Sequence, residues 1–189
     1  MANPLISVLI PCYNIEKYAN QAIKSITNQS YNKLEIILLE DGSTDDTKLI
    51  LESIKKKDPR ILLLYNETNQ GLANTLNKGI ENATGDYIAR MDGDDISHPK
   101  RLQIQLNYLI NNPAISVVGS KALPINEEDE LLASSDITYF NSSTLNATCY
   151  LLNPFVHGSI LAKGSVLKKY RYKNVGSEDF ELWCNLNYN

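Results

Sequence analysis

Short apolar runs alternate with segments of helical period through the first 120 residues of the chain. The runs occupy residues 5–11, 34–40, 61–65, 87–91 and 115–119. Between them, apolar residues recur at spacings of three, four and seven, which places them on one face of a helix. Parallel strands need a crossover connection, and that connection is usually a helix. The alternation therefore predicts an α/β architecture, with a mostly parallel sheet covered by helices.

The regular alternation fades beyond residue 120. Residues 121–150 are rich in turn-forming and polar residues and predict hairpin and loop structure, with residues 127–130 at an exposed tip. Residues 164–189 predict short helices. We expect one domain over residues 1–189. The last predicted helix, 178–187, has no glycine cap or breaker after it, so we also expect the natural protein to continue beyond Asn189.

Composition excludes several classes of protein. Apolar residues make up 43% of the chain, and 18 basic against 22 acidic side chains leave a net charge of −4, which excludes a disordered or polybasic chain. We expect no nucleic-acid partner. No apolar stretch approaches the roughly 20 residues that span a bilayer, and the N-terminus lacks a secretion signal. The three cysteines form no C-x-x-C pair, so we expect reduced thiols in a cytoplasmic protein.

Chemically reactive residues gather at the ends of three predicted strands. In open α/β sheets, ligands bind outside the carboxyl ends of the strands. These ends carry Pro11-Cys12-Tyr13-Asn14, Glu40-Asp41-Gly42-Ser43 and Asp92-Gly93-Asp94-Asp95. A Walker loop and a G-x-G-x-x-G motif are both absent from the sequence, so metal and side chains would have to hold a phosphate group.

The acidic segment Asp92-Gly93-Asp94-Asp95 has two interpretations. Three carboxylates in four positions repel one another at neutral pH unless a cation or protonation offsets them. Mg²⁺ or Mn²⁺ on a D-x-D loop satisfies this, with substrate phosphates and water as the other ligands. The alternative is a solvated loop that caps the following helix. Asp41-Gly42-Ser43 is weaker still, because Asp-Gly-Ser commonly forms a turn before a helix.

Two further groups of residues each have a structural and a functional interpretation. Glu178 and Asp179 lie in the first turn of a predicted helix, where they either complement the helix dipole or supply a general base facing a cleft. His157 is either a hydrogen-bonded structural residue or a ligand of metal or diphosphate.

Five segments in order carry a family resemblance. They are Ser7-Val8-Leu9-Ile10-Pro11-Cys12-Tyr13-Asn14, Asp41-Gly42-Ser43-Thr44-Asp45, Asn69-Gln70-Gly71-Leu72-Ala73, the run from Gly85 to Asp95, and Ser177-Glu178-Asp179-Phe180-Glu181-Leu182-Trp183. Together they resemble family 2 glycosyltransferases of the GT-A fold over essentially the whole chain. The resemblance implies a Rossmann-like, mostly parallel central sheet flanked by helices. It also implies a nucleotide-sugar-binding half, residues 1–119, and a small acceptor-side half, residues 120–189.

The resemblance further implies inverting, metal-dependent transfer of a hexosyl or N-acetylhexosaminyl group from a nucleotide diphosphate sugar, with UDP the commonest nucleotide. By position in the motifs, Pro11, Tyr13 and Asp41 line the nucleotide pocket, and Asn69 lies nearby. Arg90 contacts the diphosphate or supports the acidic loop.

The remaining roles concern metal and chemistry. Asp94 matches the principal ligand of Mn²⁺ or Mg²⁺, and Asp92 faces the ribose or the metal. His157 falls where some relatives place a histidine near the metal or diphosphate. Asp179 matches the general base, with Glu178 as the alternative.

The acceptor that the resemblance implies is a saccharide or a lipid-linked glycan in surface polysaccharide synthesis, reached by peripheral association at the inner face of the membrane. One departure from the family pattern and two rival functions stand beside it. Leu76-Asn77-Lys78 replaces an arginine and asparagine common in relatives, although Lys78 supplies a positive charge. A sugar-phosphate nucleotidyltransferase normally needs a glycine-rich basic loop after the first strand, which residues 12–16 lack. A non-catalytic nucleotide-binding module is the other alternative.

Overall fold

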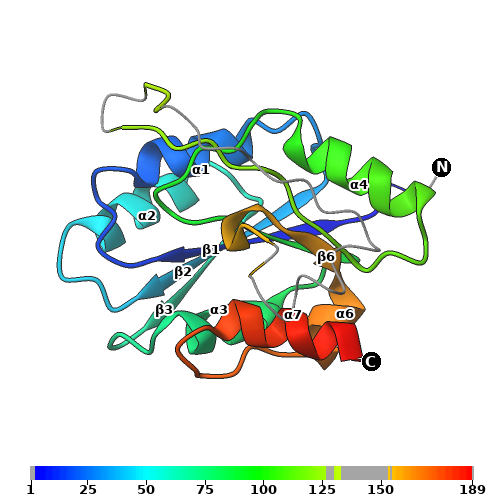
Figure 1. Ribbon diagram of the computed structural model, residues 1–189. Helices are drawn as coiled ribbons and strands as arrows, with labels where there is room; N and C mark the ends of the chain where they lie inside the picture. Colours follow the sequence, from blue (N-terminus) through cyan, green and yellow to red (C-terminus); the bar gives the residue numbers. More distant parts are fainter. Residues whose placement is uncertain (1–2, 127–129, 133–152, 154, 189) are drawn as a thin grey trace.

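The computed structural model of the chain describes residues 3–126, 130–132, 153 and 155–188 (Figure 1). Within these residues, six strands form one sheet in the order β3-β2-β1-β4-β6-β5. The strands are β1 (Ile6–Cys12), β2 (Leu34–Asp41), β3 (Ile61–Asn66), β4 (Tyr87–Arg90), β5 (Val117–Val118) and β6 (Leu161–Lys163). The helices are α1 (Ala19–Thr27), α2 (Thr47–Lys55), α3 (Leu72–Asn82), α4 (Arg101–Asn111), α6 (Gly164–Lys169) and α7 (Glu178–Tyr188), with the 3₁₀ helix η1 (His157–Ser159) before β6.

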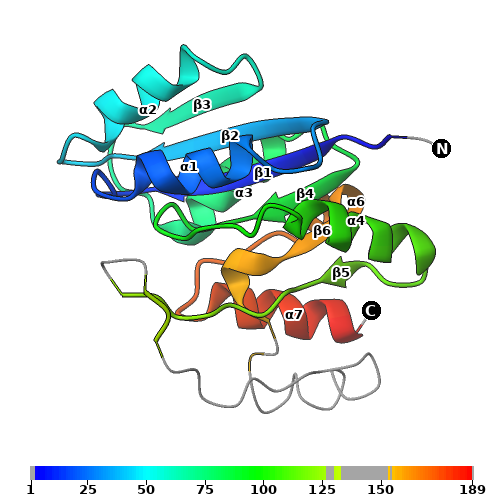
Figure 2. The ribbon, with the colours of Figure 1, turned by 90° about the horizontal axis from the view of Figure 1, so that it is seen from above.

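The sheet confirms the predicted α/β architecture. Strands β1 to β4 are parallel to one another, with Ile6 of β1 paired to Leu34 of β2 on one side and to Tyr87 of β4 on the other. Figure 2 shows these strands side by side, with β6 and β5 continuing the sheet. β6 runs antiparallel to both of its neighbours. Sequence periodicity does not predict β6, because three residues are too few to show a period, and its strand form depends on pairing with β4 and β5.

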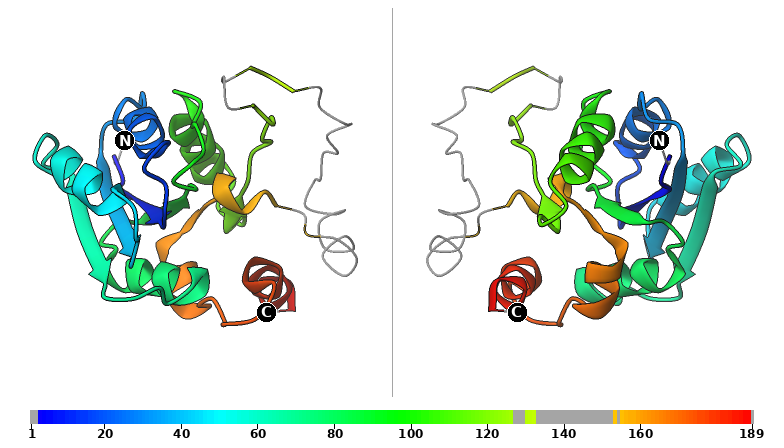
Figure 3. Two further views of the ribbon diagram at one scale, coloured as in Figure 1. Left: turned by 90° about the vertical axis from the view of Figure 1, so that its left-hand side faces the viewer. Right: turned by 90° about the vertical axis from the view of Figure 1, so that its right-hand side faces the viewer.

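Helices cover both faces of the sheet (Figure 3). One apolar core joins α1, α2 and α4 to the sheet, and the other joins α3, α6 and α7. Successive residues of β1 point into opposite cores, since Val8 and Ile10 belong to the first and Leu9 to the second. Burial on both faces explains why the predicted strands are nearly continuous apolar runs rather than alternating ones.

The region after β5 confirms the predictions in part. Ile125 and Leu131 form an antiparallel bridge, and the Asn126 amide donates to the carbonyl of Glu130, as in a hairpin. Residues 127–129 and 133–150, which include most of the predicted tip, lie outside the described residues. The short helices predicted for residues 164–189 are α6 and α7. In the part of the chain that the structure describes, no helix has the length and apolar character needed to cross a membrane.

The end of β2 lies against the loop that follows β3. Gly42, directly after Asp41, has φ +71°, and a Cβ atom there would lie 2.6 Å from the backbone nitrogen of Asn69. Gly71, at the other end of that loop, also has positive φ, +80°, but a Cβ atom there would meet nothing within 4 Å. A substitution at Gly71 therefore introduces backbone strain alone, whereas a substitution at Gly42 introduces both backbone strain and a steric clash.

We expect Gly71→Ala to lower the free energy of unfolding by about 1 to 3 kcal/mol, since it introduces backbone strain alone. Gly42→Ala should cost more, because the new methyl group must also displace the loop at residues 66–71. Urea denaturation of both variants measures the difference. Equal losses would show that the contact between Gly42 and Asn69 is not a tight one.

Candidate functional site

The segments that follow β1, β2 and β4 meet at one edge of the sheet, as the strand-end rule predicts. The Asn14 backbone amide donates to Ser43 Oγ (3.2 Å), and the Thr44 amide donates to Asn14 Oδ1 (2.9 Å). A Cβ atom at Gly93 would lie 2.9 Å from the carbonyl oxygen of Pro11. The three predicted motifs are therefore neighbours, and Tyr13, 45% exposed, lies at their edge.

Asp41 is the last residue of β2 and is only 4% exposed. Its carboxylate accepts hydrogen bonds from Asn66 Nδ2 (2.7 Å), the Gln70 amide (2.9 Å) and the Gly71 amide (3.2 Å). Asn69, exposed in the same loop, accepts a bond from the Gly71 amide at 3.0 Å. Asp41 thus shapes the loop that carries Asn69, and the nucleotide contacts of Pro11, Tyr13, Asp41 and Asn69 stay predictions.

A residue that the sequence analysis misses, Asn66, connects this loop to α3. Its Oδ1 accepts a hydrogen bond from Lys78 Nζ (2.8 Å), and Lys78 also donates to the carbonyl of Tyr65 (2.5 Å). Lys78 therefore brings its positive charge to the Asp41 loop. The signal for Asn66 is present in the sequence, since it ends β3 and the strand-end rule applies there too.

The acidic loop Asp92-Gly93-Asp94-Asp95 begins with an ion pair. Arg90, with a side chain only 4% exposed, makes a two-pronged bond to Asp92, in which Nη1 donates to Oδ2 (2.5 Å) and Nη2 donates to Oδ1. Arg90 therefore supports the acidic loop, one of its two predicted roles. Burial raises the pKa of Asp92, and the charge of Asp94 raises it further, while Arg90 opposes both effects.

Asp94 and Asp95, the other two acids of this loop, are exposed at the surface. Partial desolvation of the Asp95 carboxylate, followed by repulsion from Asp92 and Asp94, raises its pKa against the opposing charges of Arg90 and Arg101. Beneath the loop, Arg101 donates from Nη1 to the Arg90 carbonyl (3.2 Å) and from Nε to Ser97 Oγ (2.8 Å). Burial lowers the pKa of Arg101 to about 10, so it stays charged at neutral pH, and no sequence signal distinguishes it from a surface arginine. The three carboxylates of the acidic loop outnumber the two guanidinium groups of Arg90 and Arg101, and this excess of negative charge on oxygen ligands suits a hard divalent cation.

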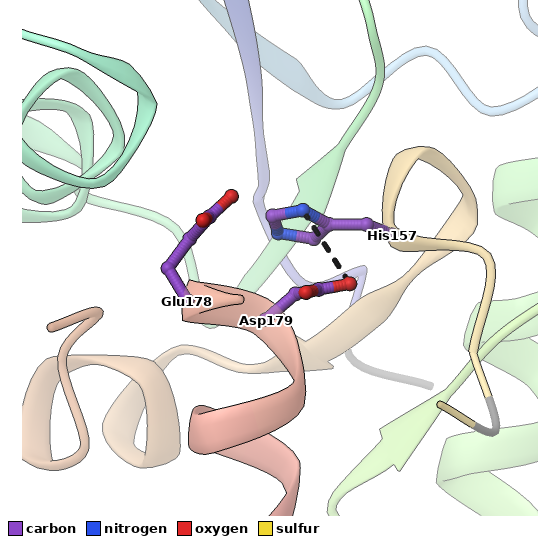
Figure 4. Close-up of side chains that lie close together, drawn as sticks. All are labelled: His157, Glu178 and Asp179. Carbon is purple, nitrogen blue, oxygen red and sulfur yellow. Dashed lines mark ion pairs between the residues drawn. The ribbon is translucent and has the colours of Figure 1, made fainter. Parts of the chain in front are cut away.

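A second group forms between η1 and the start of α7 (Figure 4). Ligand atoms of His157, Glu178 and Asp179 all lie within 4.8 Å of one another. Asp179 accepts hydrogen bonds from Asn153 Nδ2 at Oδ2 (2.5 Å) and from the Phe180 amide at Oδ1 (2.8 Å). His157 Nδ1 lies 4.0 Å from Asp179 Oδ2. Asp179 is thus held by donors beside the site, at the position predicted for the base.

Gly158 brings the two groups together. A Cβ atom there would lie 2.7 Å from Asp92 Oδ2 and 3.0 Å from Asp95 Oδ2, so η1 packs directly against the acidic loop. Among the described residues, however, the predicted metal set of Asp92, Asp94 and His157 does not form a group of three with ligand atoms within 4.8 Å. The set that does so is His157, Glu178 and Asp179.

The chain is similar in sequence to a known family and to proteins of other organisms. Residues 7–171 match the family described as Glycosyl transferase family 2. A protein of Haemophilus influenzae, named as an uncharacterized glycosyltransferase, is 38% identical over 186 residues, which cover 97% of this chain and 72% of the relative. The putative glycosyltransferase EpsE of Bacillus subtilis is 37% identical over 188 residues, covering 96% of this chain and 66% of EpsE.

Solved structures share the fold. Mannosyltransferase PcManGT from Pyrobaculum calidifontis, solved with GDP-Man and Mn²⁺, superposes with a TM-score of 0.74 at 20% identity, covering 96% of this chain and 51% of that one. S. aureus TarS 1-349 in complex with UDP superposes with a TM-score of 0.69 at 23% identity, covering 97% of this chain and 54% of TarS 1-349. The chain thus has the GT-A fold and spans about half the length of these two solved chains.

We expect Asp95→Asn to remove a pH-dependent penalty on stability in metal-free buffer. The pKa of Asp95 in the folded protein lies above its ordinary value of 3.8, so the native state binds the extra proton and the contribution of Asp95 to stability falls as pH rises through this window. Relative to wild type, the free energy of unfolding of the variant should therefore increase from about pH 3 to about pH 7.

Urea denaturation over this pH range measures the difference between variant and wild type. Asp46→Asn is the matched control, because Asp46 is exposed and its side chain caps no helix. A difference for Asp95→Asn that stays constant with pH would contradict burial and repulsion as its source.

Proposed function

The chain belongs to glycosyl transferase family 2, and on this premise we propose that it is an inverting glycosyltransferase. It takes a sugar from a nucleotide diphosphate sugar, with UDP as the nucleotide, and transfers it to a hydroxyl of a saccharide or lipid-linked acceptor. The observation that carries the proposal is the packing of η1 between the acidic loop after β4 and Asp179 on α7. This arrangement would put the acidic loop, facing the diphosphate, close to Asp179, which accepts the proton.

The donor site is assigned to the strand ends that carry Pro11, Tyr13 and Asp41. Support comes from the linked loops at this edge of the sheet and from the fold shared with TarS and PcManGT, which are solved with UDP and with GDP-Man. Lys78, held against the Asp41 loop by Asn66, brings a positive charge to the same edge. Its charge would substitute for the arginine that the family resemblance places in α3.

The metal site is assigned to Asp94 and Asp92, which would hold Mn²⁺ or Mg²⁺. Support comes from their mutual repulsion with Asp95, from the exposure of Asp94, and from the Mn²⁺ in the PcManGT complex. A bound divalent cation supplies charge neutralisation for the departing diphosphate. Arg90 keeps Asp92 oriented in this loop through its two-pronged bond.

Asp179 is assigned as the general base. The acceptor hydroxyl attacks the anomeric carbon on the face opposite the diphosphate and forms the new C–O bond while the old bond to the diphosphate oxygen breaks. Asp179 takes the hydroxyl proton, and the bonding electrons leave with the nucleoside diphosphate, so the anomeric configuration inverts in one step. Asn153 and the Phe180 amide orient the carboxylate for this proton transfer.

The acceptor is proposed to carry an apolar portion. A cavity of about 660 Å³ adjoins the acidic loop at Asp95 and lies between the outer side of α4 and the segment after β5. Apolar side chains dominate its lining, among them Ile104, Tyr108, Leu123 and Leu131, all at least 48% exposed. A lipid-linked glycan would fill such a cavity better than a free sugar, which supports action at the inner face of the membrane in surface glycan synthesis.

A non-catalytic nucleotide-binding module is the alternative function. It would keep the fold and the donor site but would need neither a metal-binding loop nor a base. The arrangement of Asp179 next to η1 and the acidic loop favours the enzyme. The two experiments below separate binding from transfer.

We expect Asp94→Asn to weaken Mn²⁺-dependent UDP binding at least tenfold, since a direct ligand contributes no less than the outer partners whose loss costs about 10- to 100-fold. Calorimetric titration with UDP, GDP, ADP and CMP, each with and without Mn²⁺, measures this effect and identifies the nucleotide. Glu81→Gln is the control, because it removes one exposed carboxylate in the last turn of α3, away from the strand ends. Metal-independent binding of UDP in wild type would contradict the metal assignment.

We expect Asp179→Asn to bind UDP with wild-type affinity and to lose at least about a hundredfold in kcat, the contribution typical of a general base. Release of UDP in the presence of acceptor measures transfer. Glu178→Gln, which changes the neighbouring acid, should retain most of the activity. The opposite ranking of these two variants would move the base to Glu178.

A further inference from the structure

The buried contact between His157 and Tyr172 has no role in the function proposed above. Tyr172 lies between α6 and α7, is 5% exposed, and its hydroxyl lies 2.8 Å from His157 Nε2. The two rings are tilted against each other with centroids 5.2 Å apart, and the rings of Trp183 and His157 form a T-shaped pair with centroids 6.2 Å apart. The imidazole thus packs against the rings of Tyr172 and Trp183 and also makes a hydrogen bond with Tyr172.

Tyr172 itself is held in place by a different helix. Asn77 of α3 donates from Nδ2 to the Tyr172 carbonyl (2.8 Å) and accepts from the Tyr172 amide at Oδ1 (3.0 Å). This reciprocal pair ties the backbone of the segment before α7 to the middle of α3. The position of the Tyr172 hydroxyl is therefore set by the body of the domain.

The direction of the hydrogen bond follows from what each atom can do. If the Tyr172 hydroxyl donates to Nε2, the imidazole carries its single proton on Nδ1, which lies 4.0 Å from Asp179 Oδ2. If Nε2 donates instead, Nδ1 has a lone pair beside that carboxylate. The buried phenolic proton would then have no acceptor, since the hydroxyl makes no other hydrogen bond among the described residues. Buried polar groups are rarely left in that condition.

We propose that Tyr172 donates its hydroxyl hydrogen to Nε2 of His157 and thereby holds the imidazole as the Nδ1–H tautomer, so that Nδ1, 4.0 Å from Asp179 Oδ2, carries a proton and not a lone pair. Tyr172 and Asn77 are then positioning residues that act on Asp179 through His157. This catalytic consequence rests on the proposed function, whereas the tautomer does not.

The electrostatics of the site agree with a neutral ring and a protonated phenol. Burial and the charge of Arg90 lower the pKa of His157 to about 3, against the opposing effect of Asp179. Burial raises the pKa of Tyr172, Arg90 opposes this effect, and the carboxylates of Asp179, Glu178 and Asp92 raise the pKa further. A neutral imidazole has one proton to place, so its location is a question of tautomer alone.

The assignment also bears on the metal. A metal-binding imidazole needs a free nitrogen lone pair. In this arrangement Nε2 accepts from Tyr172 and Nδ1 is protonated, so neither nitrogen is available. His157 then leaves the predicted ligand set, and the acidic loop alone would supply the protein ligands.

Long-range ¹H–¹⁵N NMR of the full chain, without metal and near neutral pH, tests the tautomer directly. The chain has two histidines, and His98→Gln identifies the signals of His157. We expect wild type to show the Nδ1–H pattern and Tyr172→Phe to shift toward the Nε2–H form. Tyr170→Phe is the matched control, because it removes a nearby hydroxyl that has no hydrogen bond among the described residues, and it should leave the pattern unchanged. An Nε2–H pattern in wild type, or no change in Tyr172→Phe, would overturn the assignment.

Steady-state kinetics with the same variants tests the positioning role. Tyr172→Phe should lower kcat about tenfold, comparable to the loss of an orienting outer partner, while KM and Mn²⁺-dependent UDP affinity stay within about twofold of wild type. A lost tautomer with unchanged kcat would overturn the positioning role and leave the proposed function intact. Absence of transfer by wild type would instead contradict the proposed function, and the NMR result would still decide the tautomer.

Discussion

The buried guanidinium of Arg90, at the end of β4, holds the two halves of the site together. Its side chain pairs with Asp92, its carbonyl accepts from Arg101, and its amide donates to the carbonyl of Ile160 just after η1. A buried charge of this kind is costly unless it is paired and hydrogen-bonded. The acidic loop supplies the charge partner through Asp92, and η1 packs on the guanidinium at Gly158, where an added Cβ atom would lie 3.1 Å from Arg90 Nη1. The position of each therefore depends on Arg90. The positive charge of Arg90 also acts on His157 and helps to lower its pKa.

Close approach of backbones is the second constraint on the site. Added Cβ atoms at Gly42, Gly93 and Gly158 would each lie less than 3 Å from an atom of another segment. At these three points glycine lets the loops after β2 and β4, and η1, touch their neighbours directly. Any parallel sheet brings its strand ends together loosely. Glycine at these three points fixes the distances among the carboxylates there, as a bound metal would require.

Two supports for the site come from α3, although no acidic residue of this helix belongs to the site. Lys78 reaches the Asp41 loop through Asn66, and Asn77 holds the segment of Tyr172. One helix thus braces both the proposed donor side and the proposed base side. Although Leu76-Asn77-Lys78 departs from the family pattern, Asn77 and Lys78 both make hydrogen bonds that support the site. This shared support also places the residues that orient the site on a regular element, where their geometry is more accurate than on a loop.

The sequence by itself determined the α/β architecture, the strands β1 to β4 and the gathering of Asp41 and Asp92–Asp95 at one edge. Hydrophobic period and the strand-end rule are local properties that need no knowledge of contacts. Only the tertiary structure decided the pairing of Arg90 with Asp92, the packing of Gly158 on the acidic loop, the strand β6, and the roles of Arg101 and Tyr172. Apart from the Arg90–Asp92 pair, which joins residues two positions apart, these features arise between segments far apart in the chain. Whether a side chain there is buried, paired or charged depends on what the fold brings against it, and no local pattern records that.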